Sequence, residues 1–149
     1  MLTYEQWDTI ADAYIPSLAL IYFMLIAYTI YQRQYGLALT YFAMTLLCSV
    51  VVYSLMFIDN AMHIWPRFNL DYSTHTALAL VFVQSIWQII SNVKIFTKIF
   101  LILSFVSYLL LMKWMAYHSV RDMLTTILVL TPFFVTLTIL FKHKIRVNN

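Results

Sequence analysis

The sequence predicts an all-α integral membrane protein, a bundle of about five transmembrane helices. Of its 149 residues 63% are hydrophobic and only 10% are charged, which leaves too few polar side chains to cover a water-soluble surface. Gly36 is the only glycine and there are three prolines, so long helices joined by short loops are favoured over strands and tight turns. The length fits a single transmembrane domain, residues 1–149.

Five apolar runs approach the ~20 residues that a helix needs to cross ~30 Å of hydrocarbon. The predicted spans are 15–32, 36–58, 74–93, 96–112 and 119–141. Before the first span, Trp7, Ile10 and Tyr14 have roughly helical spacing, which predicts a short amphipathic helix on the outer membrane surface. The single cysteine, Cys48, lies in an apolar run and is expected to be a packing residue.

Basic residues are divided unequally between the two predicted membrane faces. One face holds Arg33, Lys94, Lys98, Lys142, Lys144 and Arg146. The other holds Arg67, Lys113 and Arg121 with all the acidic residues, Glu5, Asp8, Asp12, Asp59, Asp71 and Asp122. The positive-inside rule therefore predicts an external N-terminus and a cytoplasmic C-terminus. The compact loops favour a bacterial inner membrane, and the basic balance is assigned to topology and anionic lipid rather than to nucleic acid.

Two loops on the predicted external face carry most of the ionisable side chains. They are the polar loop 59–74 and the short loop 113–118. Together with the adjoining helix ends they supply His63, Arg67, Asp71, His75, Lys113, His118, Arg121 and Asp122. Ionisable groups at membrane depth are costly, so this cluster is a candidate functional site.

His118 and Asp122 are four residues apart, a spacing that places two side chains on one face of a helix. A carboxylate that binds one ring nitrogen fixes the histidine tautomer and leaves the other nitrogen available as a base or nucleophile. Taken alone, the same spacing also fits a histidine and an aspartate that only pair with each other at the membrane interface.

The third predicted span opens with Asp71-Tyr72-Ser73-Thr74-His75-Thr76. Ser73 or Thr74 is expected to cap the helix, and the backbone N–H groups of its first turn, together with the helix dipole, favour an anion such as phosphate. His75 would then lie within a turn of that anion. An interfacial histidine with its polar edge in water is the alternative.

These two elements resemble the type 2 phosphatidic acid phosphatase superfamily of integral lipid phosphatases. Ser73-Thr74-His75-Thr76 is similar to the family's Ser-Gly-His-Thr element, and His118-Ser-Val-Arg-Asp122 to its His-x-x-x-Asp element. The two elements also occur in the family's order, separated by a predicted helical hairpin. The residue sequences of both elements are equally similar to those of the sphingomyelin synthase branch, which transfers phospholipid head groups.

The resemblance implies a lipid phosphatase or head-group phosphotransferase at the external, periplasmic face. His118 would attack phosphorus to form a phosphohistidine, Asp122 would stabilise its imidazolium, and His75 would protonate the leaving alcohol. The phosphate oxygens would be held by Arg67, Lys113, Arg121 and Thr74. Neither a metal nor a cofactor is expected. The substrate would be a phospholipid or a polyprenyl phosphate in the bilayer, with hydrolysis and transfer both open.

The competing hypothesis is a catalytically inactive relative that serves as a lipid-binding or structural subunit of a membrane complex. The partner would be another membrane protein or a second copy of this chain. The family's Lys-x-x-x-x-x-x-Arg-Pro element is incomplete, because Asn60 stands where the lysine would fall and Pro66-Arg67 has the inverted order. The family's Ser-Arg before the second histidine is Leu111-Met112. A proton-coupled transporter is less favoured, because no charged residue lies near the middle of a predicted span.

Overall fold

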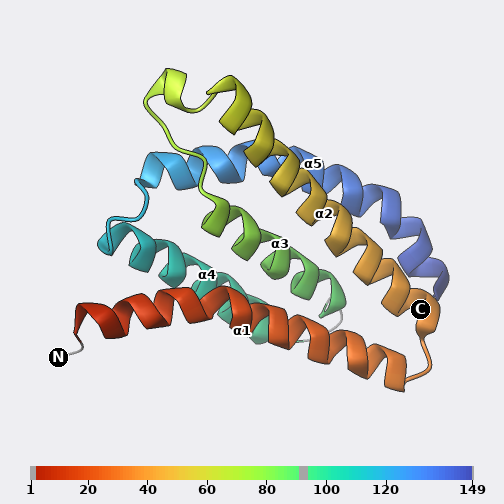
Figure 1. Ribbon diagram of the computed structural model, residues 1–149. Coiled ribbons are helices and arrows are strands. Elements are labelled where there is room, and N and C mark those ends of the chain that lie inside the picture. Colours follow the sequence, from red (N-terminus) through yellow and green to blue (C-terminus); the bar gives the residue numbers. More distant parts are fainter. Residues whose placement is uncertain (1–2, 91–93, 149) are drawn as a thin grey trace.

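The computed structural model describes residues 3–90 and 94–148, and these ranges form a helical bundle (Figure 1). Its elements are α1 (Tyr4–Tyr31), α2 (Tyr35–Met62), the 3-10 turn η1 (Pro66–Phe68), α3 (Thr74–Ile89), α4 (Ile95–Trp114) and α5 (Val120–Asn148). Within the described ranges, α1, α2, α4 and α5 up to Phe141 are long and apolar enough to cross a membrane. The prediction of an all-α membrane protein is confirmed.

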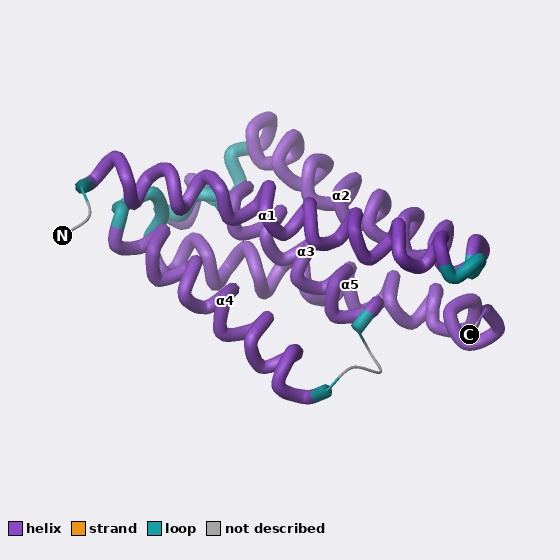
Figure 2. The backbone as a smooth tube through the Cα atoms, turned by 90° about the horizontal axis from the view of Figure 1, so that it is seen from below, coloured by secondary structure: helices purple, strands orange, loops and turns teal. Residues whose placement is uncertain are grey.

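The third predicted span, 74–93, differs from the helix found there. α3 has 16 residues, and at 1.5 Å per residue it is about 24 Å long, which is less than the ~30 Å of a hydrocarbon core. Residues 91–93, the end of the predicted span, lie outside the described part of the chain. α3 is the central helix, because it packs against each of the other four (Figures 1 and 2).

Small side chains explain how four helices approach α3 so closely. Its buried positions include Thr76, Ala77, Ala79 and Ser85, each at most 1% exposed. In a membrane there is little hydrophobic drive between helices, so close backbone approach and interhelical hydrogen bonds supply much of the attraction. The sequence of α3 therefore suits a helix surrounded by protein rather than by lipid.

Polar side chains of α3 form hydrogen bonds to the helices on either side. Thr45 of α2 donates its hydroxyl to Ser85 Oγ over 2.8 Å. Gln84 donates its amide to Thr138 Oγ1 over 2.8 Å and to the Phe134 carbonyl over 3.1 Å, both in α5. These bonds fix the rotation of α3 between α2 and α5.

The expected separate surface helix before the first span is wrong. α1 runs without a break from Tyr4 to Tyr31 and so includes that segment. Its start is set by a capping box, in which Gln6 N–H donates to Thr3 Oγ1 over 3.3 Å and Thr3 N–H donates to Gln6 Oε1 over 2.9 Å. Cys48 is buried at 1% exposure, as expected for a packing residue.

The connections gather at the two ends of the bundle. The segment between α2 and α3, the loop between α4 and α5 and the start of α1 lie at one end, and the C-terminus lies at the other (Figure 1). The residues of the candidate site therefore share one end, because the helices run antiparallel to their neighbours along the chain.

Replacing Gln84 should measurably loosen the bundle. Gln84→Ala removes both hydrogen bonds to α5, and interhelical bonds of this kind average about 0.6 kcal/mol each, so we expect a loss of about 1 kcal/mol. Thermal unfolding in detergent measures it. Thr131→Ala is the matched control, since the Thr131 hydroxyl donates only to the Ile127 carbonyl of its own helix. An equal effect of the two substitutions would contradict the interhelical assignment.

Candidate functional site

Two histidines from different elements face each other at the loop end of the bundle. His75 lies in the first turn of α3, and His118 lies in the loop that precedes α5. Their ring centroids are 6.4 Å apart. Tyr117 lies parallel to the His75 ring with 6.5 Å between centroids. The fold therefore brings together the two histidines that the sequence motifs single out.

Asp71 supplies the carboxylate beside His118. Its Oδ2 lies 3.4 Å from His118 Nδ1, an ion-pair distance without hydrogen-bond geometry. The Asp71 side chain is 71% exposed, whereas the His118 side chain is 12% exposed. The Nδ1 atom itself is buried and has no hydrogen-bond partner. The Nδ1 edge of the imidazole is thus turned to Asp71.

Asp122 does not hold the imidazole of His118, contrary to the helical spacing argument. His118 precedes α5, so the two residues do not share a helix face. Both carboxylate oxygens of Asp122 accept backbone N–H groups: Oδ2 from Ser119 over 2.8 Å and Oδ1 from Asp71 over 2.9 Å. The carboxylate partner of His118 is Asp71, and Asp122 positions the Asp71 backbone.

The Asp122 contacts form a capping box at the start of α5. Asp122 N–H donates to Ser119 Oγ over 3.2 Å, which completes the reciprocal pair with the bond from Ser119 N–H. One turn later Thr126 Oγ1 accepts the Ser73 N–H over 3.1 Å and donates to the Asp122 carbonyl over 2.8 Å. Two residues of α5 therefore secure the backbone that leads into α3.

The segment between α2 and α3 is anchored at a second place. Asp59, buried at 6% exposure, accepts the Trp65 N–H over 2.8 Å. Tyr72 donates its hydroxyl to the Val52 carbonyl over 3.1 Å, and its ring meets that of Trp65 edge-on at 5.1 Å. Burial raises the pKa of the Tyr72 phenol, so this hydroxyl stays a donor. Asp71 directly precedes Tyr72, so its backbone is held by this anchor as well as by Asp122.

Burial lowers the pKa of His118. The charges of Asp71 and Asp122 oppose this effect, and His75 adds to it. Because desolvation is the largest cause, the neutral imidazole is favoured near neutral pH. A neutral imidazole has the nitrogen lone pair that a nucleophile or base requires.

Backbone strain lies next to this histidine. Ala116 has φ 59°, a left-handed conformation that costs a non-glycine residue roughly 1–2 kcal/mol. Ala116 N–H donates to the Lys113 carbonyl over 3.0 Å, and Tyr117 N–H to the Met112 carbonyl over 3.1 Å, which closes α4. The strained turn reverses the chain so that Tyr117 and His118 approach His75.

The predicted phosphate ligands lie at the same end but are not joined to the histidines. Arg67 in η1, Lys113 at the end of α4 and Arg121 at the start of α5 are all exposed. Within the described ranges, none of these three forms an ion pair. Thr74 is the first residue of α3, and Ser73 caps the helix by accepting the Thr76 N–H over 3.3 Å. Among the described side chains, no group of three or more His, Cys, Asp or Glu is arranged to hold a metal ion.

Replacing Asp122 should destabilise the protein more than replacing Asp71. Asp122→Asn leaves only one side-chain oxygen for two backbone N–H donors, and hydrogen bonds to a charged group contribute about 1.5–3 kcal/mol each. Asp71→Asn removes only the charge of an exposed carboxylate beside His118, and pairs of exposed charges usually contribute about 0–1 kcal/mol. Thermal unfolding in detergent compares the two. Equal losses would contradict the structural assignment of Asp122.

Asp71→Asn should lower the pKa of His118 further. The Asp71 carboxylate favours the imidazolium and so raises this pKa, while His75 and the second carboxylate, Asp122, are unchanged by the substitution. Titration of the histidine ring by NMR gives the value in both proteins. His63 is exposed at the end of α2 and serves as the internal reference. An unchanged or raised pKa of His118 would show that Asp71 does not act on the ring.

No protein-family model matches this chain, and neither a curated protein nor a solved structure matches it.

Proposed function

We propose that this chain is a membrane lipid phosphatase or phospholipid head-group phosphotransferase that works through a phosphohistidine. The observation that carries the proposal is the pair of facing histidines, 6.4 Å between centroids, with a carboxylate 3.4 Å from one of them. A phosphorus atom between two such rings would have a nucleophile on one side and a proton donor on the other. The resemblance of the same two histidine elements to the type 2 phosphatidic acid phosphatase superfamily favours this chemistry.

The reaction would proceed in two displacements. Nε2 of neutral His118 attacks phosphorus, the bond from phosphorus to the lipid oxygen breaks, and protonated His75 gives its proton to that oxygen. Water or an acceptor alcohol then attacks the phosphohistidine, His75 takes the acceptor's proton, and the bond from phosphorus to nitrogen breaks. Asp71 beside Nδ1 would stabilise the positive charge that His118 develops.

Binding a phosphate group requires cations or N–H donors around its negatively charged non-bridging oxygens. Arg67 in η1, Lys113 at the end of α4 and Arg121 at the start of α5 belong to elements that meet at the loop end of the bundle, and their exposed side chains would be available to a bound head group. Thr74 opens α3, where backbone N–H groups and the helix dipole favour an anion. In this proposal the three cationic side chains move to the phosphate when the lipid binds.

The proposed topology has five spans, with α3 crossing as the enclosed central helix. The acidic residues and the candidate site would face the periplasm of a bacterial inner membrane, and the C-terminus would be cytoplasmic. This orientation places the histidines at the level of the outer-leaflet head groups. Substrates compatible with it are phosphatidic acid, phosphatidylglycerol phosphate, a polyprenyl pyrophosphate, or a phospholipid whose head group is transferred.

An inactive lipid-binding or structural subunit is the second candidate. It is favoured by one observation, that the three exposed cations make no ion pair or hydrogen bond with either histidine in the described structure. Such a protein would bind an anionic head group at the same place without turning it over, alone or in a homo-oligomer or membrane complex.

The decisive experiment measures release of phosphate or head group by detergent-purified protein. The panel contains phosphatidic acid, phosphatidylglycerol phosphate, undecaprenyl pyrophosphate and phosphatidylcholine. We expect His118→Ala to abolish release, because it removes the nucleophile. His75→Ala should lower the rate by about 10²–10⁴-fold, the usual contribution of a general acid.

His63→Asn is the matched control for this experiment. His63 is an exposed histidine of the same end, and its φ of 53° is a conformation that asparagine tolerates. Full activity in this variant, with loss in the other two, would support the two-histidine mechanism. A folded wild-type protein that turns over no member of the panel would favour the inactive subunit instead.

A further inference from the structure

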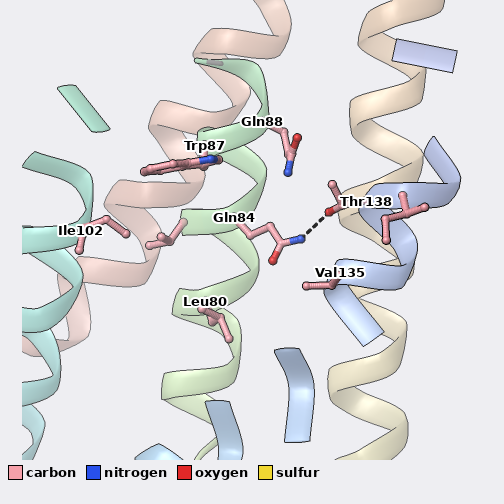
Figure 3. A pocket seen from close by; sticks show the side chains of 9 residues that line it. Leu80, Gln84, Trp87, Gln88, Ile102, Val135 and Thr138 are labelled. Atoms are coloured by element: carbon pink, nitrogen blue, oxygen red, sulfur yellow. Dashed lines mark hydrogen bonds between the residues drawn. The ribbon is translucent and has the colours of Figure 1, made fainter. Parts of the chain in front are cut away.

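A groove opens between α4 and α5 on the half of the bundle away from the histidines. The two helices leave the loop that contains His118 and diverge, so that α4 packs on α1 and α3 while α5 packs on α2 and α3 (Figure 2). The resulting cavity has a volume of about 340 Å³ and is floored by α3. Figure 3 shows Ile102 of α4 on one side, Val135 and Thr138 of α5 on the other, and Gln84 between them.

The wall of this groove is chemically close to hydrocarbon. Its residues are mainly aliphatic, and the donors of Gln84 are already used on Thr138 and on the Phe134 carbonyl (Figure 3). Trp87 lies toward the end of α3, with the Lys98 ammonium 5.5 Å from its ring centroid. A polar ligand would find few hydrogen-bond partners here, whereas an alkyl chain requires none.

The groove lies at the depth that the far end of a long lipid tail would reach. Gln84 and Gln88 follow His75 by 9 and 13 residues on the same helix, which at 1.5 Å per residue is about 14 and 20 Å. One leaflet of hydrocarbon is about 15 Å thick. The loop with His118 joins the two helices that form the walls, and the lining residue nearest to His75 along α3 is Leu80, five residues on.

We propose that this groove holds one long hydrocarbon chain of the lipid whose phosphate is bound between His75 and His118. The inference rests on the proposed function and adds its substrate class, a lipid selected by chain length as well as by its phosphate. Convex lipid-facing surfaces touch a chain on one side, whereas this open groove would contact it from three helices, α3, α4 and α5. The chain is acyl or isoprenoid, since both present the same apolar surface to the wall.

Filling the groove should separate long-chain from short-chain substrates. Val135→Trp and Ile139→Trp place a large ring at positions that line the groove and are 49% and 64% exposed, so the core is not disturbed. Leu140→Trp is the matched control, because Leu140 is 66% exposed on the same helix and does not line the groove. The assay compares dioleoyl and dihexanoyl phosphatidic acid, with undecaprenyl pyrophosphate as the isoprenoid arm.

We expect both groove variants to lose at least about tenfold in kcat/KM on the long-chain lipid, because several buried methylene groups lose their contacts. Activity on dihexanoyl phosphatidic acid should be unchanged, which also reports that the variants are folded. Equal activity of all variants on both chain lengths would overturn the groove assignment and leave the proposed function intact. The long-chain substrate whose kcat/KM falls in the groove variants identifies the chain as acyl or isoprenoid.

A binding experiment tests the groove without turnover. Phosphatidic acid with a diazirine in mid-chain is photolysed with the wild-type protein, and the labelled residues are mapped by mass spectrometry. Label concentrated on Trp87, Ile102 and Ile139, and lost in Val135→Trp but not in Leu140→Trp, supports the proposal even if no lipid is hydrolysed. Label spread over exposed helices, or collected in the cavity of about 200 Å³ beside Phe68 and Val129, overturns it.

Discussion

The candidate site depends on two hydrogen bonds that join the start of α3 to the first turns of α5. Asp122 accepts the N–H of Asp71, and Thr126 accepts the N–H of Ser73. Near a membrane boundary an unpaired backbone donor is costly, so the chain before α3 must find acceptors where it enters the bundle. Because α5 supplies them, the segment that contains Asp71 and His75 is fixed relative to the loop that contains His118.

The central position of α3 extends the same constraint along the bundle. A 16-residue helix with small buried side chains allows four longer helices to pack around it, and its hydrogen bonds to α2 and α5 fix its rotation. α4 and α5 each pack on α3 rather than on each other, so they separate as they leave their common loop. The packing of α4 and α5 on α3 therefore accounts both for the histidine pair at the start of α3 and for the groove along its second half.

Local sequence signals predicted the helices and the grouping of His75 with His118 at one end, and they narrowed the cap of α3 to Ser73 or Thr74, of which Ser73 is the cap found. The start of α1 was missed although Thr3 and Gln6 carry the capping-box signal. The partner of His118 could not be predicted in this way. Asp71 reaches it only through packing of α3 against α5, whereas the spacing to Asp122 described a helix that begins after His118.

The two carboxylates near His118 differ in what their environments permit. Asp122 is 8% exposed and both of its oxygens are engaged by backbone donors, so protonation or reorientation would release the loop that it holds. Asp71 is 71% exposed and has no such obligation, so its side chain is able to follow the imidazole as charge develops. In this fold the Asp122 carboxylate therefore holds the backbone in place, whereas the Asp71 carboxylate is free to adjust its position beside His118. A site built in this way holds its backbone still while the carboxylate that faces the His118 ring remains free to move.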